Sequence, residues 1–134
     1  MKIGINCRSF LKKQYTGIGR YTYNLIKTLT EIDDENRYVL YARKGLFHHN
    51  RDISGLRTKN FSVKIDWLRR GPEKILKRVD VYHSPCPEMI GFASGVKVVV
   101  TVHDVIIKTF PRGHTVNAIL ETERQLRTIS ERAH

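Results

Sequence analysis

Strand-like and helix-like segments alternate along this chain, and that alternation is the strongest constraint on its fold. Residues 2–6 predict a short strand with Ile3 and Ile5 on one face. Residues 18–32 repeat apolar side chains at helical spacing, and residues 37–42, which are rich in tyrosine and valine, predict a second strand. A strand, a helix and a strand in this order form a β-α-β unit, which favours parallel pairing.

The rest of the chain continues the same alternation. Residues 43–60 show no clear period and are predicted to form a loop that could include a short helix, whereas 61–67 alternate like an edge strand with one solvated face. Residues 71–79 predict a short helix. Segments 80–84 and 96–102 predict two central strands, and the second is apolar at most positions, as in a strand buried on both faces. The pattern therefore indicates an α/β class with a mainly parallel sheet.

A last helix is predicted over residues 115–133, with Thr115 as its N-cap. Its apolar side chains recur on one face, which we expect to pack inward. This inner stripe consists of Val116, Ile119, Leu120, Leu126, Ile129 and Ala133.

The composition limits the classes of protein to which the chain can belong. Its 134 residues suffice for one domain, and no apolar stretch reaches the roughly 20 residues that a membrane-spanning helix needs. Cys7 and Cys86 are too few for a disulfide framework, so free thiols in a reducing compartment are expected. The net charge is +11, and residues 43–78 carry 11 basic and 3 acidic side chains. That block could meet phosphates, anionic lipid or nucleic acid, or form a solvated basic face.

Polar residues follow three of the predicted strands, where parallel sheets gather their ligands. They lie in 16–21 (Thr-Gly-Ile-Gly-Arg-Tyr), in 83–85 (His-Ser-Pro) and at 103–104 (His-Asp). Glycines at a helix N-terminus let a phosphate approach the free N–H groups, and Arg20 could add a charge-assisted contact. The same glycines could serve only the geometry of a tight turn. The loop lacks the third glycine of a dinucleotide fingerprint and the lysine of an ATPase phosphate loop.

His103 could donate a hydrogen bond to a ligand hydroxyl or phosphate, and Asp104 could orient it or cap the next turn. A purely structural role for both residues stays open at this point. A metal site is disfavoured, because only His83 and Cys86 show a short ligand-like spacing. A hydrolase is equally unsupported, since the chain has no nucleophile elbow.

Taken together, four segments resemble one family. They are residues 1–6 (Met-Lys-Ile-Gly-Ile-Asn), the loop 16–21, residues 80–85 (Asp-Val-Tyr-His-Ser-Pro), and 99–104 (Val-Val-Thr-Val-His-Asp) with the Phe-Pro pair that follows at 110 and 111. Their order along nearly the whole chain resembles the N-terminal domain of retaining, nucleotide-sugar-dependent glycosyltransferases of family four, in its mannosyltransferase-like branch.

The resemblance implies a Rossmann-like three-layer domain, the N-terminal half of the two-domain GT-B architecture. Residues 1–134 would form the acceptor-side domain without its last strand, and the C-terminal nucleotide-sugar domain would be absent. We therefore expect this piece alone to be inactive and to self-associate through the surface that the last strand would cover.

The implied reaction moves a sugar, with mannose as the best guess, from a nucleoside diphosphate to an acceptor hydroxyl with retention of configuration. Neither a metal ion nor another cofactor is expected. His103 would be the catalytic residue and would hydrogen-bond the transferred sugar. Gly17 and Gly19 would lie beside the donor diphosphate. The resemblance also places Arg20, Ser84 and Asp104 in the substrate site, with Asp104 mainly orienting and structural.

The resemblance implies that this domain contacts the acceptor, which suggests a role for the basic residues within 43–78. Trp67 and Leu68 precede a basic group that would suit an anionic membrane and a glycan or lipid-linked acceptor, although a solvated helix face explains it equally well. This basic group, called the basic patch below, consists of Arg69, Arg70, Lys74, Lys77 and Arg78. The expected location is the cytoplasm, peripherally at the inner membrane face.

Two other functions remain open. A non-catalytic α/β module that binds a nucleotide or another phosphate ligand would use the same glycine loop and His103. A nucleic-acid-binding domain would explain the basic composition, but the chain shows no recognition helix, RNA-binding aromatic motif or zinc finger, so nucleic acid is not an expected partner. Nucleic-acid affinity should also fall steeply as salt rises, which separates that function from the others.

Overall fold

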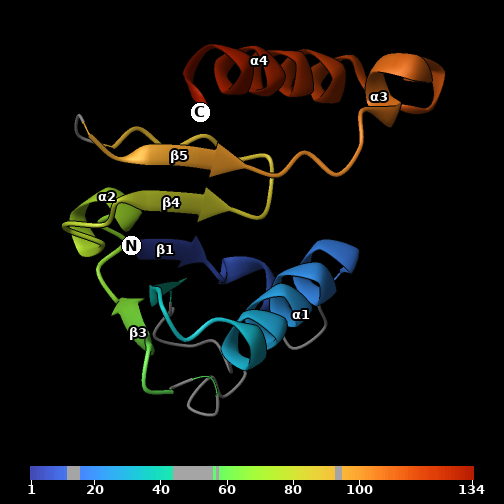
Figure 1. Ribbon diagram of the computed structural model, residues 1–134. Helices are drawn as coiled ribbons and strands as arrows, with labels where there is room; N and C mark the ends of the chain where they lie inside the picture. The colour runs from blue at the N-terminus through green and yellow to red at the C-terminus, as the bar shows by residue number, and fades with distance from the viewer. Residues whose placement is uncertain (12–15, 44–55, 57, 93–94) are drawn as a thin grey trace.

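Five parallel strands form one sheet between helical layers (Figure 1). The computed structural model describes residues 1–11, 16–43, 56, 58–92 and 95–134, so most of the predicted 43–60 loop lies outside the described residues. The strands are β1 (Lys2–Asn6), β2 (Arg37–Arg43), β3 (Phe61–Asp66), β4 (Val81–Ser84) and β5 (Lys97–Val100). Their order is β3-β2-β1-β4-β5, and every pair is parallel. The predicted α/β, Rossmann-like three-layer class is confirmed.

Helix α1 (Gly17–Ile32) covers one face of the sheet. Alternation along β2 explains how a core forms there, because Tyr38 and Leu40 point to the same side. They pack with Ile5 of β1 and Ile26 of α1, which are almost wholly buried. This burial fixes α1 against β1 and β2.

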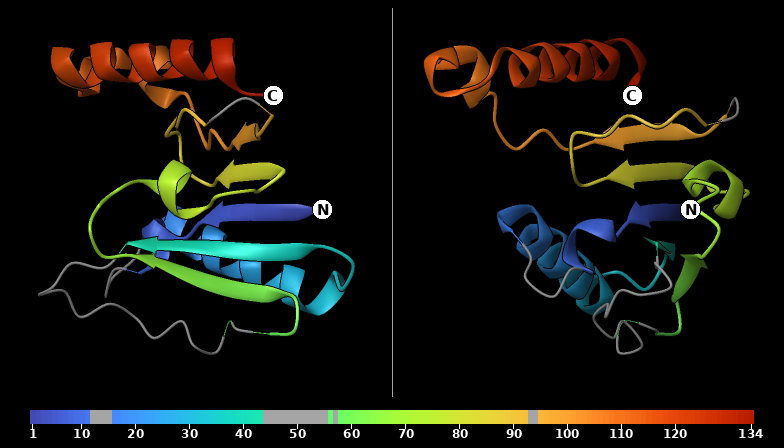
Figure 2. Two further views of the ribbon diagram at one scale, coloured as in Figure 1. Left: turned by 90° about the vertical axis from the view of Figure 1, so that its left-hand side faces the viewer. Right: turned by 180° about the vertical axis from the view of Figure 1, so that it is seen from behind.

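Helix α2 (Pro72–Ile75) covers the opposite face, as the two views of Figure 2 show. It is shorter than the predicted helix over 71–79, but Leu76 and Val79, which follow it, are buried in one cluster with Tyr82. Gly4 of β1 faces this core, and a Cβ there would lie 2.9 Å from Leu76 Cδ1. The close packing of Leu76 on β1 therefore favours a glycine at this point.

The strand order creates a switch point between β1 and β4. From β1 the chain adds β2 and then β3 on one side, and it returns to place β4 and β5 on the other side. Loops after β1 and β4 consequently diverge, and open α/β sheets bind ligands in the crevice that this divergence leaves at their carboxyl ends.

Strand β5 lies at an edge of the sheet, so its predicted central position is wrong. Val99 is 39% exposed, and Val102 beyond the strand is 36% exposed. At this edge the His134 N–H donates to the Val98 carbonyl over 2.9 Å, and the Val98 N–H donates to His134 Nδ1 over 3.3 Å. An apolar run alone cannot show whether a neighbouring strand covers it.

Helix α4 (Val116–Arg132) is confirmed, and the Thr115 hydroxyl accepts from the Ala118 N–H as the predicted N-cap. Its predicted inner stripe is only partly correct. Ile129 is buried, but Val116 and Leu120 are exposed, because α4 lies beyond the β5 edge instead of over a face of the sheet (Figures 1 and 2).

Three short helices were not predicted from the sequence. They are two 3-10 helices, η1 (Arg8–Phe10) and η3 (Pro111–Gly113), and the single turn α3 (Ile106–Thr109). In the part of the chain that the structure describes, no helix has the length and apolar character needed to cross a bilayer.

Candidate functional site

The first turn of α1 and His103 lie at the same pocket, at the carboxyl edge of the sheet. Ile18, which stands between Gly17 and Gly19, lines a cavity of about 270 Å³ together with His103 and Asp104. Residues of the α3 and α4 region complete the wall. The topology explains this meeting, because β1 and β5 both run toward this edge and the chain leaves each strand there.

The His103 ring is fixed by two contacts. Its Nε2 lies 2.8 Å from the Pro85 carbonyl oxygen, and because a carbonyl can only accept, Nε2 carries the proton of this bond. The Tyr21 ring of α1 meets the imidazole edge-on, with 4.9 Å between centroids and an interplanar angle of 83°. The exposed His103 side chain therefore has a set orientation, with Nδ1 as the nitrogen that remains for a ligand.

The N-terminus of α1 is suited to an anion. Thr16 makes no side-chain capping bond, and the first backbone bond of the helix runs from the Arg20 N–H to the Thr16 carbonyl. The N–H groups of residues 17–19 thus precede the intrahelical ladder, and the first turn carries no acidic side chain.

Gly17 is not required by the backbone. It does not have a positive φ, and a Cβ placed on it would meet no atom of the described residues within 4 Å. The tight-turn explanation therefore does not account for Gly17, and its missing side chain leaves open space beside the pocket. Gly19 is buried in the helix.

The three other predicted substrate residues, Arg20, Asp104 and Ser84, differ in their exposure. Arg20 is exposed in the first turn of α1. Asp104 Oδ1 accepts from the Ile106 N–H over 3.1 Å, so it caps the turn that leads into α3. Ser84 is wholly buried, and its hydroxyl donates to the Cys86 carbonyl over 3.0 Å, so the structure does not bring it to the pocket surface.

Residues that sequence reasoning missed lie at the switch point. Arg8 and Glu88 form an ion pair of 3.2 Å that joins the loops after β1 and β4. Asn6 Oδ1 accepts from the Arg8 N–H, while the buried Asn6 Nδ2 has no hydrogen-bond partner among the described residues. A buried donor without a partner points to a ligand or an ordered water. The position of Asn6 and Arg8 at the carboxyl end of β1 was the sequence signal that could have found them.

His83 and Cys7 have structural environments. His83 Nε2 lies 2.8 Å from Thr101 Oγ1, and burial lowers the pKa of this imidazole. Cys7 is wholly buried, its thiol donates to the Tyr41 carbonyl, and burial raises the pKa of the thiol. Among the residues that the structure describes, no three histidine, cysteine or acidic side chains are grouped to hold a metal ion.

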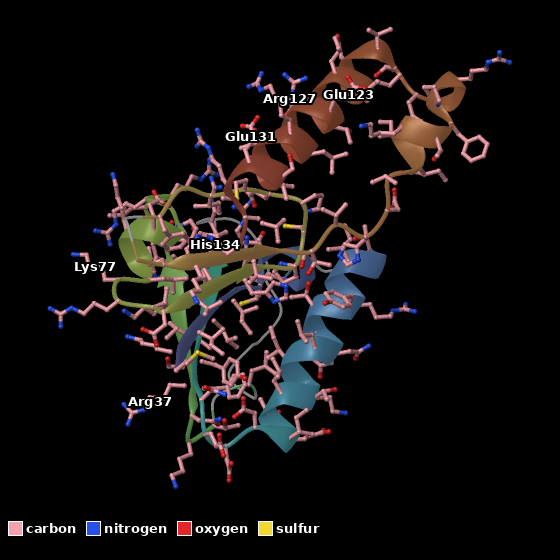
Figure 3. The ribbon with its side chains drawn as sticks, turned by 45° about the horizontal axis from the view of Figure 1, so that its top comes forward. Arg37, Lys77, Glu123, Arg127, Glu131 and His134 are labelled. Carbon is pink, nitrogen blue, oxygen red and sulfur yellow. The ribbon has the colours of Figure 1, made fainter. Side chains whose placement is uncertain are left out.

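The basic patch forms a separate surface beside α2. All five of its side chains are exposed, none belongs to the described lining of the pocket, and Lys77 points away from α1 in Figure 3. Arg69 and Arg78 both have a positive φ, which is uncommon outside glycine. The structure thus exposes all five cations and does not bring them to the pocket that His103 lines.

A buried carboxylate organises the turn that carries part of this patch. Asp66 accepts from the Arg70 N–H, the Gly71 N–H and the Tyr41 hydroxyl over 3.0, 2.9 and 2.8 Å. Burial works to raise the pKa of Asp66, but these hydrogen bonds and the charge of Arg70 outweigh it, so the pKa is lowered. The ionised carboxylate holds the turn in one conformation.

No family model, curated protein or solved structure matches this chain.

Proposed function

We propose that this chain is the acceptor-side domain of a retaining glycosyltransferase that takes its sugar, mannose in the first instance, from a nucleoside diphosphate. The observation that carries the proposal is the meeting of the α1 N-terminus and the oriented His103 at one pocket. The four sequence segments that resemble this family include both of these features.

The α1 N-terminus serves the departing diphosphate in this scheme. Glycosyl transfer develops negative charge on that group and positive charge on the sugar, so preorganised dipoles lower the barrier. The N–H groups of residues 17–19 provide such dipoles, and Arg20 lies in the same turn. Because Gly17 has no side chain, the diphosphate can approach this backbone closely. The proposed reaction uses no metal ion and no further cofactor.

His103 serves the sugar that is transferred. With Nε2–H held by the Pro85 carbonyl, Nδ1 accepts a hydrogen bond from a sugar hydroxyl. The edge contact with Tyr21 keeps the ring from turning away. Asp104 lines the same pocket and serves mainly to orient it, through the turn that it caps. The acceptor, a glycan or a lipid-linked sugar, enters from the side of α3.

The test is a transfer assay on the gene product that carries these 134 residues. Nucleoside diphosphate sugars, GDP-mannose among them, are supplied with acceptor alcohols, and NMR of the product gives its anomeric configuration. We expect transfer with retention from one donor, and binding that changes little with salt. Binding without turnover would favour a module that binds a phosphate ligand. Binding of nucleic acid that falls steeply with salt would favour a nucleic-acid-binding domain.

A further inference from the structure

Hydrogen bonds continue between the chain segments that leave β4 and β5, past the last residues that pair as strands. The register of the two strands ends at Ser84 and Val100. The Thr101 N–H still donates to the Ser84 carbonyl over 2.9 Å. The segment that leads from β5 to His103 is therefore tied at its start to the neighbouring strand.

Two side-chain contacts lie on either side of this backbone bond. His83 Nε2 lies 2.8 Å from Thr101 Oγ1, and His103 Nε2 lies 2.8 Å from the Pro85 carbonyl oxygen. The two short segments are thus joined by three hydrogen bonds, of which the last orients the His103 ring.

Packing contributes little to holding His103 in place. The His103 side chain is exposed, and so are Val102 and Asp104 on either side of it. None of these three residues belongs to either core cluster. A segment with few buried apolar contacts opens easily unless other bonds hold it. The conformation of this segment therefore depends on its hydrogen bonds to the chain around the end of β4.

The bond between His83 and Thr101 is the more protected of the two side-chain contacts. Both of its side chains are half-buried, whereas His103 is exposed. Hydrogen bonds that are shielded from water are electrostatically stronger than exposed ones. The threonine hydroxyl can donate to a ring nitrogen or accept from it, so the bond forms with either tautomer of His83.

We propose that His83 and Thr101 are positioning residues for His103. Their hydrogen bond anchors the start of the segment that carries His103, so that Nε2 stays at the Pro85 carbonyl and Nδ1 remains free for a sugar hydroxyl. The catalytic part of this inference rests on the proposed function, because it assigns two further residues to the same site. The orientation of the ring is a property of the chain itself and can be measured without a substrate.

Nuclear Overhauser effects between the Tyr21 and His103 rings measure that orientation in the 134-residue chain, because the two rings meet with 4.9 Å between centroids. We expect Thr101→Val, which replaces the hydroxyl by a methyl group, to reduce this effect at least twofold. Thr101→Ser keeps the hydroxyl and should retain it. The control is Thr128→Val, which removes a hydroxyl that donates to the Arg124 carbonyl on α4. An unchanged effect in Thr101→Val would overturn the proposal.

Variants of His83 test the same bond from the side of β4. His83→Leu removes both ring nitrogens, whereas His83→Gln keeps a hydrogen-bonding group at about the position of Nε2. We expect His83→Leu to reproduce the effect of Thr101→Val, and His83→Gln to retain most of the wild-type ring contact. Circular dichroism shows whether the variants fold. If neither His83→Leu nor Thr101→Val folds, the bond serves the fold as a whole and the proposal is wrong.

Turnover distinguishes the positioning of His103 from a general structural role. In the gene product, Thr101→Val should lower kcat at least threefold, with a smaller change in KM. The same substitution in a His103→Ala background should cause no further loss, because the effects of residues that act through one another do not add. A further threefold loss in that background would show that Thr101 acts independently of His103 and would contradict the proposal.

These readouts also separate this inference from the function on which it rests. A ring contact that weakens in Thr101→Val, in a gene product that transfers no sugar, would reject glycosyl transfer and support the positioning role. Sugar transfer that Thr101→Val leaves at the wild-type rate would support the enzyme and overturn this inference.

Discussion

At the scale of single residues, Gly4 and Gly17 lack a side chain for different physical reasons. Gly4 is enclosed, since an added Cβ would lie 2.9 Å from Leu76 Cδ1 in a core where Leu76 is 1% exposed. Gly17 is open, since an added Cβ would meet nothing within 4 Å among the residues that the structure describes. The first glycine serves packing, and we propose that the space beside the second admits a ligand.

These environments predict different effects of a glycine-to-alanine substitution on stability and activity. Gly4→Ala should lower the free energy of unfolding by about 1–3 kcal/mol, because the buried neighbours must shift. Gly17→Ala should change it by no more than about 0.5 kcal/mol, while it lowers kcat/KM for sugar transfer at least tenfold. Urea denaturation and the transfer assay measure the two quantities. Full activity of Gly17→Ala would mean that its open space is not used.

His83 predicts how stability changes with pH. Burial lowers its pKa below the ordinary value of 6.5, so the folded state keeps the ring neutral where the unfolded chain protonates it. The unfolded state then binds more protons, and the free energy of unfolding falls as the pH drops through 6.5 toward the folded pKa. The aspartates whose pKa is lowered, Asp33 and Asp66, remain ionised between pH 7 and 5.

We therefore expect part of the loss of stability between pH 7 and pH 5 to disappear in His83→Gln. Urea denaturation of both proteins at the two pH values gives the difference, in which the other histidines cancel. If the free energy of unfolding depends on pH in the same way in the wild type and in His83→Gln, folding does not change the pKa of His83 and the prediction is wrong.

At the scale of elements, the turn after β3 depends on Asp66. Asp66→Ala leaves two backbone N–H groups and the Tyr41 hydroxyl without their acceptor, and we expect a loss of about 1–3 kcal/mol or more in the free energy of unfolding. Tyr41→Phe removes one of the three bonds and should cost about 1 kcal/mol. Asp34→Ala, at an exposed aspartate, is the control for urea denaturation. An Asp66→Ala protein as stable as the control would show that the turn forms without its anchor.

The basic patch gives a second prediction at this scale. Replacing its five cations by glutamine should weaken binding to phosphatidylglycerol vesicles in low salt roughly a hundredfold or more, at about 1 kcal/mol for each cation near the surface. Both the patch set and its control lower the net charge from +11 to +6. The control replaces three arginines and two lysines that are exposed elsewhere, namely Arg37, Arg124, Arg127, Lys27 and Lys59. Equal weakening of vesicle binding by both sets would show that the patch contributes only through the net charge of the protein.

Local periodicity was sufficient to predict most elements. The β1, α1 and β2 segments follow from apolar spacing over a few residues, and Thr115 follows from its position before α4. The edge position of β5 could not be predicted, because it depends on which other strands lie beside it. The exposure of Val116 and Leu120 depends in turn on the place of α4 beyond that edge.

At the scale of the whole molecule, the parallel sheet explains why the site was only partly predictable. The carboxyl ends of all five parallel strands lie at the same edge of the sheet, so the sequence was enough to assign residues that follow separate strands to one region. The contact of Tyr21 with His103 and the bond to Pro85 depend on strand order and loop paths, which the spacing of residues does not encode. Ser84 is the last residue of β4 and shares the buried positions of that strand with Tyr82, so strand alternation accounts for its burial.

The central claim is that His103 acts on the sugar at the carboxyl-edge pocket, and the turnover of a His103→Ala gene product tests it most directly. We predict that kcat falls about a hundredfold or more, while circular dichroism shows that the variant still folds, because the lost side chain is exposed and is not part of either core cluster. His134→Ala, at an exposed histidine on the β5 edge that is labelled in Figure 3, should retain wild-type turnover. A His103→Ala protein that transfers sugar at the wild-type rate would contradict the account.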